Sequence, residues 1–536
     1  MAKVIRVLHD ILQDAAAAKP DKPAVLVRDA SMTYGQILDE STRLADVLMG
    51  AGVRRVDRIG CFLEKRFEKV TAIFGISLAG GVFVPIRRLS TASQAAHIVH
   101  DSGSKVVITT YSRLPMIAEC LKDMPNLKVV IAIGKPEEGK GAELPGVDVK
   151  DWGAALAAAS AKPDLPRVVE PDLAAIMYTS GSTGSPKGVV FSHLNVVTGA
   201  YTVSEYLKIT ENDRLLSILT FGFDYGLNQL TTCFLQHASI VLLDYLFPKD
   251  ITTAVNKYGV TGLAAVAATW IQLVPIDDFN EAKMPTLRYV TNSGGAVPEE
   301  FVRQIRRKCP KVQVYLMYGL TEAFRSTFLP PEMVDTHPTS MGKAIPGEEI
   351  VILGADGKPV GPGETGELVH RGPLVALGYW NAPELTAKRY KRNPTQPPEV
   401  PIPEMAVFSG DKVRIDAEGF LYFVGRDDEM IKSAGNRISP TEIEDLLYKS
   451  GIIREAMALG VPHEKYGQSV YAILVPAEGQ APDQAAVIAH CKKAMPAYMV
   501  PSQVEFRDGL PRNANGKVDR SLIKKQVYEK LGIPPK

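Results

Sequence analysis

Long hydrophobic runs are missing from the sequence. No segment of the 536 residues approaches an uninterrupted apolar stretch of about 18 residues, so no transmembrane helix is expected. The N-terminal stretch also lacks the unbroken apolar region of a secretory signal, because His9, Asp10 and Asp14 interrupt its apolar residues. These absences predict a protein of the cytoplasm.

Cysteine is scarce as well. The sequence has five cysteines, an odd number, and no two of them are spaced as C-x-x-C. This distribution argues against a disulfide framework or a zinc site and fits a reducing compartment. The five are Cys61, Cys120, Cys233, Cys309 and Cys491.

An excess of charge of one sign is also absent. The chain has 61 basic and 60 acidic residues, a formal net charge of +1. This balance argues against a nucleic-acid partner held by bulk electrostatics. At 536 residues the chain is too long for one hydrophobic core, so two or more domains are expected.

What the sequence does have is a glycine- and hydroxyl-rich stretch, YTSGSTGSPKGVVFSH, from Tyr178 to His193. Apolar segments of strand length flank it, which is unusual for a flexible linker. Consecutive N–H groups of such residues form a concavity that suits phosphate oxygens, and Lys187 adds a positive charge. The stretch is therefore predicted to handle phosphate. It departs from the P-loop pattern G-x-x-x-x-G-K-[ST], because Pro186 precedes the lysine and Gly188 follows it.

Strand-like and helix-like segments alternate through the first half of the chain. A helix is predicted to begin after Thr33, which has Gln36 at capping-box spacing. Strands near 57–64, 82–86, 105–109 and 128–134 alternate with helices, which predicts a largely parallel sheet covered on both faces. Near residue 350 short strands are broken by glycine and proline, as in a small antiparallel sheet or barrel.

The last hundred residues show a compact α+β pattern. Helices are predicted at 439–450 and 483–495, and strands at 454–461 and 469–477. The boundary is placed between Gly425 and Asp428, giving domains 1–427 and 428–536. The predicted fold class is α/β. A large N-terminal domain of doubly wound mixed sheets carries a small barrel-like β part and precedes a small α+β domain.

Further motifs occur in a fixed order. After YTSGSTGSPKG come NSGGA (292–296), YGLTE (318–322), SGD (409–411), GRDDEMIKSAGNRISPTEIE (425–444) and PRNANGKVDR (511–520). Together they resemble the ANL superfamily of adenylate-forming enzymes, which includes acyl-CoA synthetases, peptide-synthetase adenylation domains and luciferases. The chain is most similar to the AMP-forming acyl-CoA synthetase branch, and within it to ligases associated with exosortase gene clusters.

This resemblance implies a two-step reaction that uses ATP and Mg²⁺. A carboxylate attacks the α-phosphate to give an acyl-adenylate and pyrophosphate, and a thiol then displaces AMP. The thiol implied is CoA, or alternatively the phosphopantetheine of a separate carrier protein. In this family the small C-terminal domain rotates between the two steps. A homodimer is compatible with these features.

The resemblance also implies roles for particular residues. Lys517, Thr321, Glu322 and Arg426 are the implied catalytic residues, and Glu322 would bind Mg²⁺, which prefers oxygen ligands. Asp428 is the implied hinge, and Gly435 is expected to face the active site during thioester formation. The implied ATP- and AMP-binding residues are Thr179, Ser180, Gly181, Ser182, Thr183, Gly184, Lys187, Gly294, Gly295, Ala296, Tyr318, Gly319, Thr321, Asp411, Phe423, Arg426 and Lys432.

The acyl pocket is expected at Phe223, Asp224, Gly294 and Gly319. The Phe223–Asp224 pair is similar to amino-acid-activating domains, in which the aspartate pairs with the substrate ammonium. Those domains usually continue F-D-x-S, but Gly226 stands in the place of the serine here. Asp224 is therefore expected either to recognise an amine or to cap the helix that follows it.

Three functions are alternatives to a CoA ligase. A stand-alone adenylation enzyme would load an amino acid or acyl group onto a carrier protein. A non-catalytic regulatory relative would be expected to lose Lys517, Glu322 or Asp411, and all three are present. A luciferase-like oxygenase is compatible with the predicted fold, but no residue pattern indicates that activity.

Overall fold

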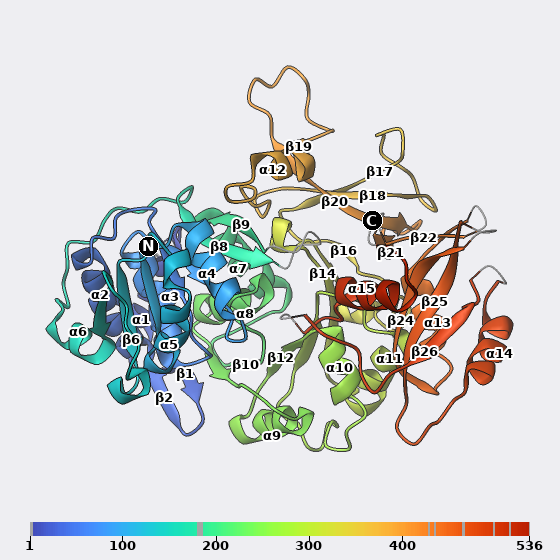
Figure 1. Cartoon of the computed structure of the whole chain (residues 1–536), viewed down its shortest axis with the longest axis horizontal. Helices are drawn as coiled ribbons and strands as arrows, with labels where there is room; N and C mark the ends of the chain where they lie inside the picture. The colour runs from blue at the N-terminus through green and yellow to red at the C-terminus, as the bar shows by residue number, and fades with distance from the viewer. Residues whose placement is uncertain are drawn as a thin grey trace.

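The structure is a computed structural model that describes residues 4–179, 186–426, 429–433, 436–463, 467–496, 499–513 and 516–534. Figure 1 shows the chain running from the blue N-terminal elements on the left to the red C-terminal elements on the right. The α-helices are α1 (Leu8–Ala18), α2 (Tyr34–Gly50), α3 (Phe67–Leu78), α4 (Ala92–Ser102), α5 (Leu114–Glu119), α6 (Trp152–Ala158), α7 (His193–Tyr206), α8 (Asp224–Leu235), α9 (Pro248–Tyr258), α10 (Ala267–Leu273), α11 (Glu299–Lys308), α12 (Pro383–Arg389), α13 (Pro440–Tyr448), α14 (Gln484–Ala494) and α15 (Arg520–Lys530). The 3₁₀ helices are η1 (Tyr111–Arg113), η2 (Leu121–Asp123), η3 (Pro136–Gly139), η4 (Thr321–Ala323) and η5 (Pro331–Met333).

Two large mixed sheets form the first part of the molecule. The first has the order β7-β6-β5-β3-β4-β8-β9, built from β3 (Arg58–Cys61), β4 (Val82–Pro85), β5 (Val106–Thr110), β6 (Val129–Ile133), β7 (Asp148–Asp151), β8 (Leu173–Thr179) and β9 (Lys187–Ser192). The second has the order β16-β15-β14-β13-β12-β10-β11-β1-β2, built from β1 (Pro23–Val27), β2 (Ala30–Thr33), β10 (Arg214–Ser217), β11 (Ser239–Leu242), β12 (Gly262–Ala265), β13 (Tyr289–Asn292), β14 (Gln313–Tyr318), β15 (Thr327–Leu329) and β16 (Lys343–Ala344). Their central strands pair in parallel, and antiparallel strands lie at the edges. This arrangement confirms the predicted α/β class.

Two smaller sheets follow along the chain. An antiparallel sheet contains β17 (Glu349–Leu353), β18 (Thr365–Arg371), β19 (Tyr390–Arg392), β20 (Met405–Ile415) and β21 (Leu421–Arg426). The last sheet contains β22 (Ile431–Ser433), β23 (Asn436–Ile438), β24 (Ile453–His463), β25 (Gly467–Pro476) and β26 (Gln503–Phe506). The chain changes sheet between β21 and β22. The predicted domain boundary, residues 427 and 428, lies there but outside the described residues.

The C-terminal sheet has apolar layers of its own. On one side Ile443 and Leu447 of α13 pack in one buried cluster with Val487 of α14. A separate cluster joins Ile523 of α15 to buried residues of β24 and β25. Helices therefore pack apolar side chains into two separate clusters around this sheet, which is the α+β pattern expected from the sequence.

Local signals explain where several elements begin. The hydroxyl of Thr33 accepts a hydrogen bond from the Gln36 amide at 3.2 Å, and the Gln36 side chain accepts one from the Thr33 amide at 2.8 Å. This reciprocal pair confirms the capping box predicted at the start of α2. Among the described residues, no helix is long and apolar enough to cross a bilayer.

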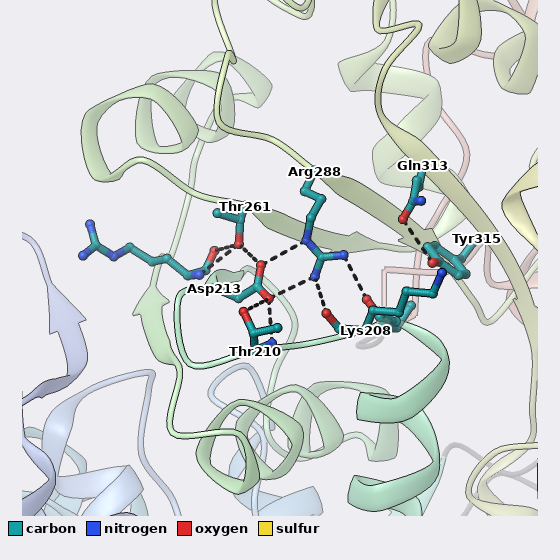
Figure 2. Close-up of polar contacts among 9 residues, drawn as sticks. Lys208, Thr210, Asp213, Thr261, Arg288, Gln313 and Tyr315 are labelled. Atoms are coloured by element: carbon teal, nitrogen blue, oxygen red, sulfur yellow. Dashed lines mark hydrogen bonds and ion pairs between the residues drawn. The ribbon is translucent and has the colours of Figure 1, made fainter. Parts of the chain in front are cut away.

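An ion pair between a buried carboxylate and a half-buried guanidinium ties three strands of the second sheet together at their amino-terminal ends (Figure 2). Asp213 precedes β10, Thr261 precedes β12 and Arg288 precedes β13. Arg288 donates to Asp213 at 3.0 Å through Nη2 and at 3.2 Å through Nε, and the Thr261 hydroxyl donates at 2.7 Å. Burial alone would raise the pKa of Asp213, but the hydrogen bonds from Arg288 and Thr261 lower it below its ordinary value. This network stabilises the amino-terminal ends of these strands, whereas the candidate active site lies at their carboxyl ends.

Candidate active site

The candidate site lies where the parallel strands of the second sheet end. Phe223 and Asp224 open α8 in the connection that follows β10, and Gly294 lies two residues beyond the end of β13. Tyr318 is the last residue of β14, and Thr321 and Glu322 form η4 just beyond it. Ligands of open α/β sheets bind at the carboxyl ends of the strands, because loops and helix N-termini converge there.

Lys517 reaches this edge from the C-terminal part of the chain. A Cβ atom built on Gly294 would lie 2.7 Å from Lys517 Cε and 3.0 Å from Nζ. The ammonium lies 5.5 Å from the centroid of the Phe223 ring. Gly294 has a φ of +83°, so glycine serves here both for its backbone conformation and for the space that Lys517 occupies.

Burial and the neighbouring charges have opposing effects on the pKa of Lys517. Burial lowers the pKa of Lys517, while the negative charges of Asp224, Asp411 and Glu322 raise it and Arg426 lowers it further. The structure therefore brings together charged residues from the N-terminal and C-terminal parts of the chain, all of which the sequence singled out. A cation held in a site of low polarity interacts strongly with any charge that develops beside it.

Asp411 and Arg426 face each other across two paired strands. The register of β20 and β21 pairs the two residues, and Arg426 Nε donates to Asp411 Oδ1 at 3.1 Å. The Tyr318 hydroxyl donates to the other carboxylate oxygen at 2.5 Å. Burial raises the pKa of Asp411, and the charge of Arg426 and the bond from Tyr318 oppose that effect.

Two neighbours support this cluster. Ser409 lies two residues before Asp411, and its hydroxyl makes the bonds that position Asp411. It accepts from the Asp411 amide at 3.0 Å and donates to the Leu368 carbonyl at 2.6 Å. Phe423 and Tyr318 both pack against the apolar core of the antiparallel sheet.

Glu322, in η4, offers a further carboxylate to the site. The Tyr379 hydroxyl donates to Glu322 Oε1 at 2.5 Å. No group of three His, Cys, Asp or Glu side chains in the described residues forms a metal cage. A single carboxylate fits Mg²⁺, which keeps several waters and is usually bound through one or two carboxylates and substrate phosphates.

The glycine-rich stretch joins two antiparallel strands. Thr179 ends β8, Lys187 begins β9, and the two residues pair across the hairpin. The flanking strands predicted from the sequence are thus confirmed. Within the loop, Ser180, Gly181, Ser182, Thr183 and Gly184 lie outside the described residues.

Other predicted residues have a looser connection with the site. Gly295 and Ala296 are exposed beyond β13, where the backbone is open to a ligand, and a Cβ built on Gly319 would lie 3.5 Å from Arg325 Cα. Lys432 is exposed on β22, where its backbone amide donates to Gln468 Oε1 at 2.7 Å. Asp428 and Gly435 lie outside the described residues, so their roles stay predictions.

Asp224 is already paired in the protein. Arg325 Nη1 lies 3.0 Å from Asp224 Oδ2, with exposed side-chain fractions of only 2% and 4%. The Thr321 hydroxyl donates to Asp224 Oδ1 at 3.3 Å. Phe223, rather than Asp224, occupies the N-cap position of α8. The structural role of Asp224 is therefore that of a buried ion-pair partner instead of a helix cap.

The structure also explains why Gly226 replaces a serine. A Cβ atom at this position would lie 2.0 Å from the Thr220 carbonyl oxygen. Real Cβ atoms do not approach backbone this closely, so the turn before α8 excludes every side chain at residue 226.

We therefore expect Gly226→Ala to destabilise the protein by about 3 kcal/mol, because overpacking against backbone cannot be relieved by a rotamer change. The measurement is the thermal unfolding midpoint of the N-terminal part. Gly50→Ala is the matched control, since Gly50 ends α2 with no atom within 4 Å of a built Cβ. Equal midpoints for the two variants would contradict the steric argument.

Sequence reasoning missed three residues of the site. They are Arg325, which pairs with Asp224, Tyr379, which bonds Glu322, and His370, whose ring stacks on Tyr318 with centroids 6.0 Å apart. Arg325 follows the YGLTE motif by only three residues, and a charged residue between Phe324 and Ser326 was the available signal. Tyr379 and His370 had no local signal.

Comparison with known proteins identifies the family. Residues 12–380 match the family described as AMP-binding enzyme, and residues 442–517 match the AMP-binding enzyme C-terminal domain. The chain therefore belongs to the AMP-binding enzyme family, and the predicted resemblance to adenylate-forming enzymes is confirmed.

Three relatives illustrate the range of this family. The chain is 30% identical to the 2-succinylbenzoate–CoA ligase of Geobacillus kaustophilus (strain HTA426), over 96% of this chain and 97% of that one. It is 29% identical to tyrocidine synthase 3 of Brevibacillus parabrevis over 97% of this chain, but spans only 8% of that protein's length. The crystal structure of ATP-bound MatB from Rhodopseudomonas palustris superposes with a TM-score of 0.85 at 25% identity, covering 98% of this chain and 100% of that one.

Proposed function

We propose that this protein is an AMP-forming acid–thiol ligase that converts a carboxylic acid to an acyl-adenylate and then to an acyl-CoA. One observation carries the proposal: Lys517 lies at the strand edge that also holds Phe223 and Gly294, within the electrostatic reach of Asp224 and Asp411. Such a cation stabilises the charge that develops when a carboxylate attacks a phosphate.

The other site residues are proposed to bind different parts of ATP. Asp411 is a bidentate acceptor suited to the two ribose hydroxyls, and Arg426 beside it is suited to ribose or phosphate. Tyr318 offers its ring to adenine, and Thr321 offers its hydroxyl to the α-phosphate. Thr179 and Lys187 flank the loop that would hold the β- and γ-phosphates. Glu322 would hold Mg²⁺, which neutralises phosphate charge when bound.

The acceptor is proposed to be CoA rather than a carrier protein. The match with a CoA ligase extends over nearly the full length of both chains, whereas the match with a peptide synthase covers a small part of the latter. The five cysteines are buried free thiols, which fits the reducing cytoplasm where we place the enzyme.

The decisive experiment separates the two steps. ATP–pyrophosphate exchange would be measured across fatty, aryl, dicarboxylic and amino acids, and the active acid would then be offered CoA or a pantetheinylated carrier protein. Exchange followed by an acyl-CoA detected by mass spectrometry is expected. Transfer to the carrier protein alone would favour a stand-alone adenylation enzyme, and no exchange with any acid would overturn the proposal.

The metal role of Glu322 gives a further expectation. Glu322→Gln keeps the bond from Tyr379 but removes the negative charge, so the apparent Mg²⁺ requirement for exchange should rise and the maximal rate should fall about 10²-fold. A titration of Mg²⁺ at fixed ATP measures both effects. Glu332→Gln, at an exposed residue of η5, is the control. An unchanged Mg²⁺ dependence in Glu322→Gln would assign the metal to other ligands.

A further inference from the structure

The Asp224–Arg325 pair lies at the proposed acyl site and differs from a surface ion pair. Both side chains are almost fully buried, and Asp224 is engaged by Arg325, whose positive charge compensates the carboxylate. Breaking a buried pair by removing one partner is costly, because the remaining charge is left without compensation. An incoming ammonium therefore meets a carboxylate whose charge is already neutralised.

Arg325 itself is only partly satisfied. Its Nη1 group donates to Asp224 and to the Phe324 carbonyl, each at 3.0 Å. Its Nε and Nη2 groups are buried and have no hydrogen-bond partner among the described residues. The guanidinium lies 4.7 Å from the centroid of the Tyr225 ring. Buried donors without an acceptor are rare in proteins, and such groups point to a missing partner.

The backbone conformation just before Arg325 is strained. Phe324, the preceding residue, has a φ of +42°, which is unfavourable for a residue with a side chain. A Cβ built on Gly199 would lie 2.7 Å from the Phe324 ring, so glycine at 199 makes room for that ring. Strained backbone of this kind persists where the surrounding structure requires it, and it often occurs at ligand sites.

We propose that Arg325 determines the substrate class of the acyl site: it occupies Asp224, so that an α-amino acid finds no free carboxylate, and it presents Nε and Nη2 to an oxygen atom of the acyl group. The inference rests on the proposed adenylating function. The substrate is then a carboxylic acid that lacks an ammonium group and carries a hydroxyl or carbonyl oxygen. An uncharged oxygen is favoured over a second carboxylate, because Asp224 already balances the charge of Arg325.

The first test uses the unaltered protein and matched pairs of acids. Pyrophosphate exchange would be compared for 3-phenylpropanoate, its 4-hydroxyphenyl counterpart and phenylalanine, and for aliphatic sets built in the same way. Acids with an oxygen substituent are expected to exceed their plain counterparts by at least about tenfold in kcat/KM, and the amino acids to stay lowest. An amino acid that exceeds its deamino counterpart in every set would overturn the inference while leaving adenylation intact.

The second test changes the pair itself. Arg325→Met removes the charge and keeps the bulk, so Asp224 becomes available to an ammonium. Exchange with oxygen-bearing acids should fall about 10- to 100-fold, and exchange with amino acids should rise relative to it. Adding Asp224→Asn should remove the amino-acid activity again. Because this double variant leaves no unpaired buried charge, it keeps the test valid if Arg325→Met alone folds poorly.

Arg307→Met serves as the control, since Arg307 pairs with Glu300 at the surface with 61% of its side chain exposed. Its substrate profile should equal that of the unaltered protein. A profile that is the same in Arg325→Met as in this control would overturn the specificity role alone. An unaltered protein that exchanges pyrophosphate with no acid at all would overturn the proposed function, and with it this inference.

Discussion

Lys517→Ala is expected to slow adenylate formation by about 10³-fold and to leave thioester formation from supplied acyl-adenylate within about tenfold of normal. The ammonium lies beside Phe223 and Gly294, where the proposed reaction joins carboxylate to α-phosphate. Removing it takes away a positive charge from a buried site at the moment when negative charge develops. The second step does not use this charge if the C-terminal domain turns away between the steps, as we propose.

The measurement follows both half-reactions in one preparation. Pyrophosphate exchange reports the first, and release of AMP from synthetic acyl-adenylate plus CoA reports the second. Lys525→Ala is the control, since Lys525 lies on α15 with 72% of its side chain exposed. Equal losses in both half-reactions would contradict the role given to Lys517, whereas a loss in the control would indicate damage to the C-terminal part.

Linking the two parts of the chain covalently should separate the steps even more sharply. Lys449 of the C-terminal part lies 3.0 Å from Glu299 of α11, and the Tyr448 and Phe301 rings approach with centroids 6.4 Å apart. This contact belongs to the arrangement in which Lys517 is in the site. We expect a cleavable bismaleimide link between Glu299→Cys and Lys449→Cys to preserve pyrophosphate exchange and to reduce thioester formation by about 10²-fold or more, because the proposed rotation is blocked.

The protein is suited to this experiment because its five native cysteines are all buried. Each single-cysteine variant treated with the same reagent is a control for the loss of the ion pair. Cleavage of the linker should restore thioester formation. A linked protein that still makes acyl-CoA at the normal rate would show that rotation is not required. It would also contradict the hinge role predicted for Asp428 and the expectation that Gly435 faces the active site during thioester formation.

The family and most of the fold could be predicted because their signals are local. Apolar periodicity marked the strands and helices, the Thr33–Gln36 spacing marked the start of α2, and six ordered motifs marked an adenylate-forming enzyme. Each of these signals lies within a short stretch of residues, where side-chain chemistry and backbone hydrogen bonding act directly.

Contacts between distant residues were decided by the tertiary structure alone. The sequence left Asp224 with two interpretations, an ammonium partner or a helix cap, and the fold supplied a third by bringing Arg325 to it from 101 residues away. It likewise placed Tyr379 on Glu322 across 57 residues and filled the space at Gly226 with the Thr220 carbonyl. Ion pairs, buried hydrogen bonds and steric exclusion depend on distances of a few ångströms. Residue types can be read along the chain, but only the packing of the sheets determines which of them come that close.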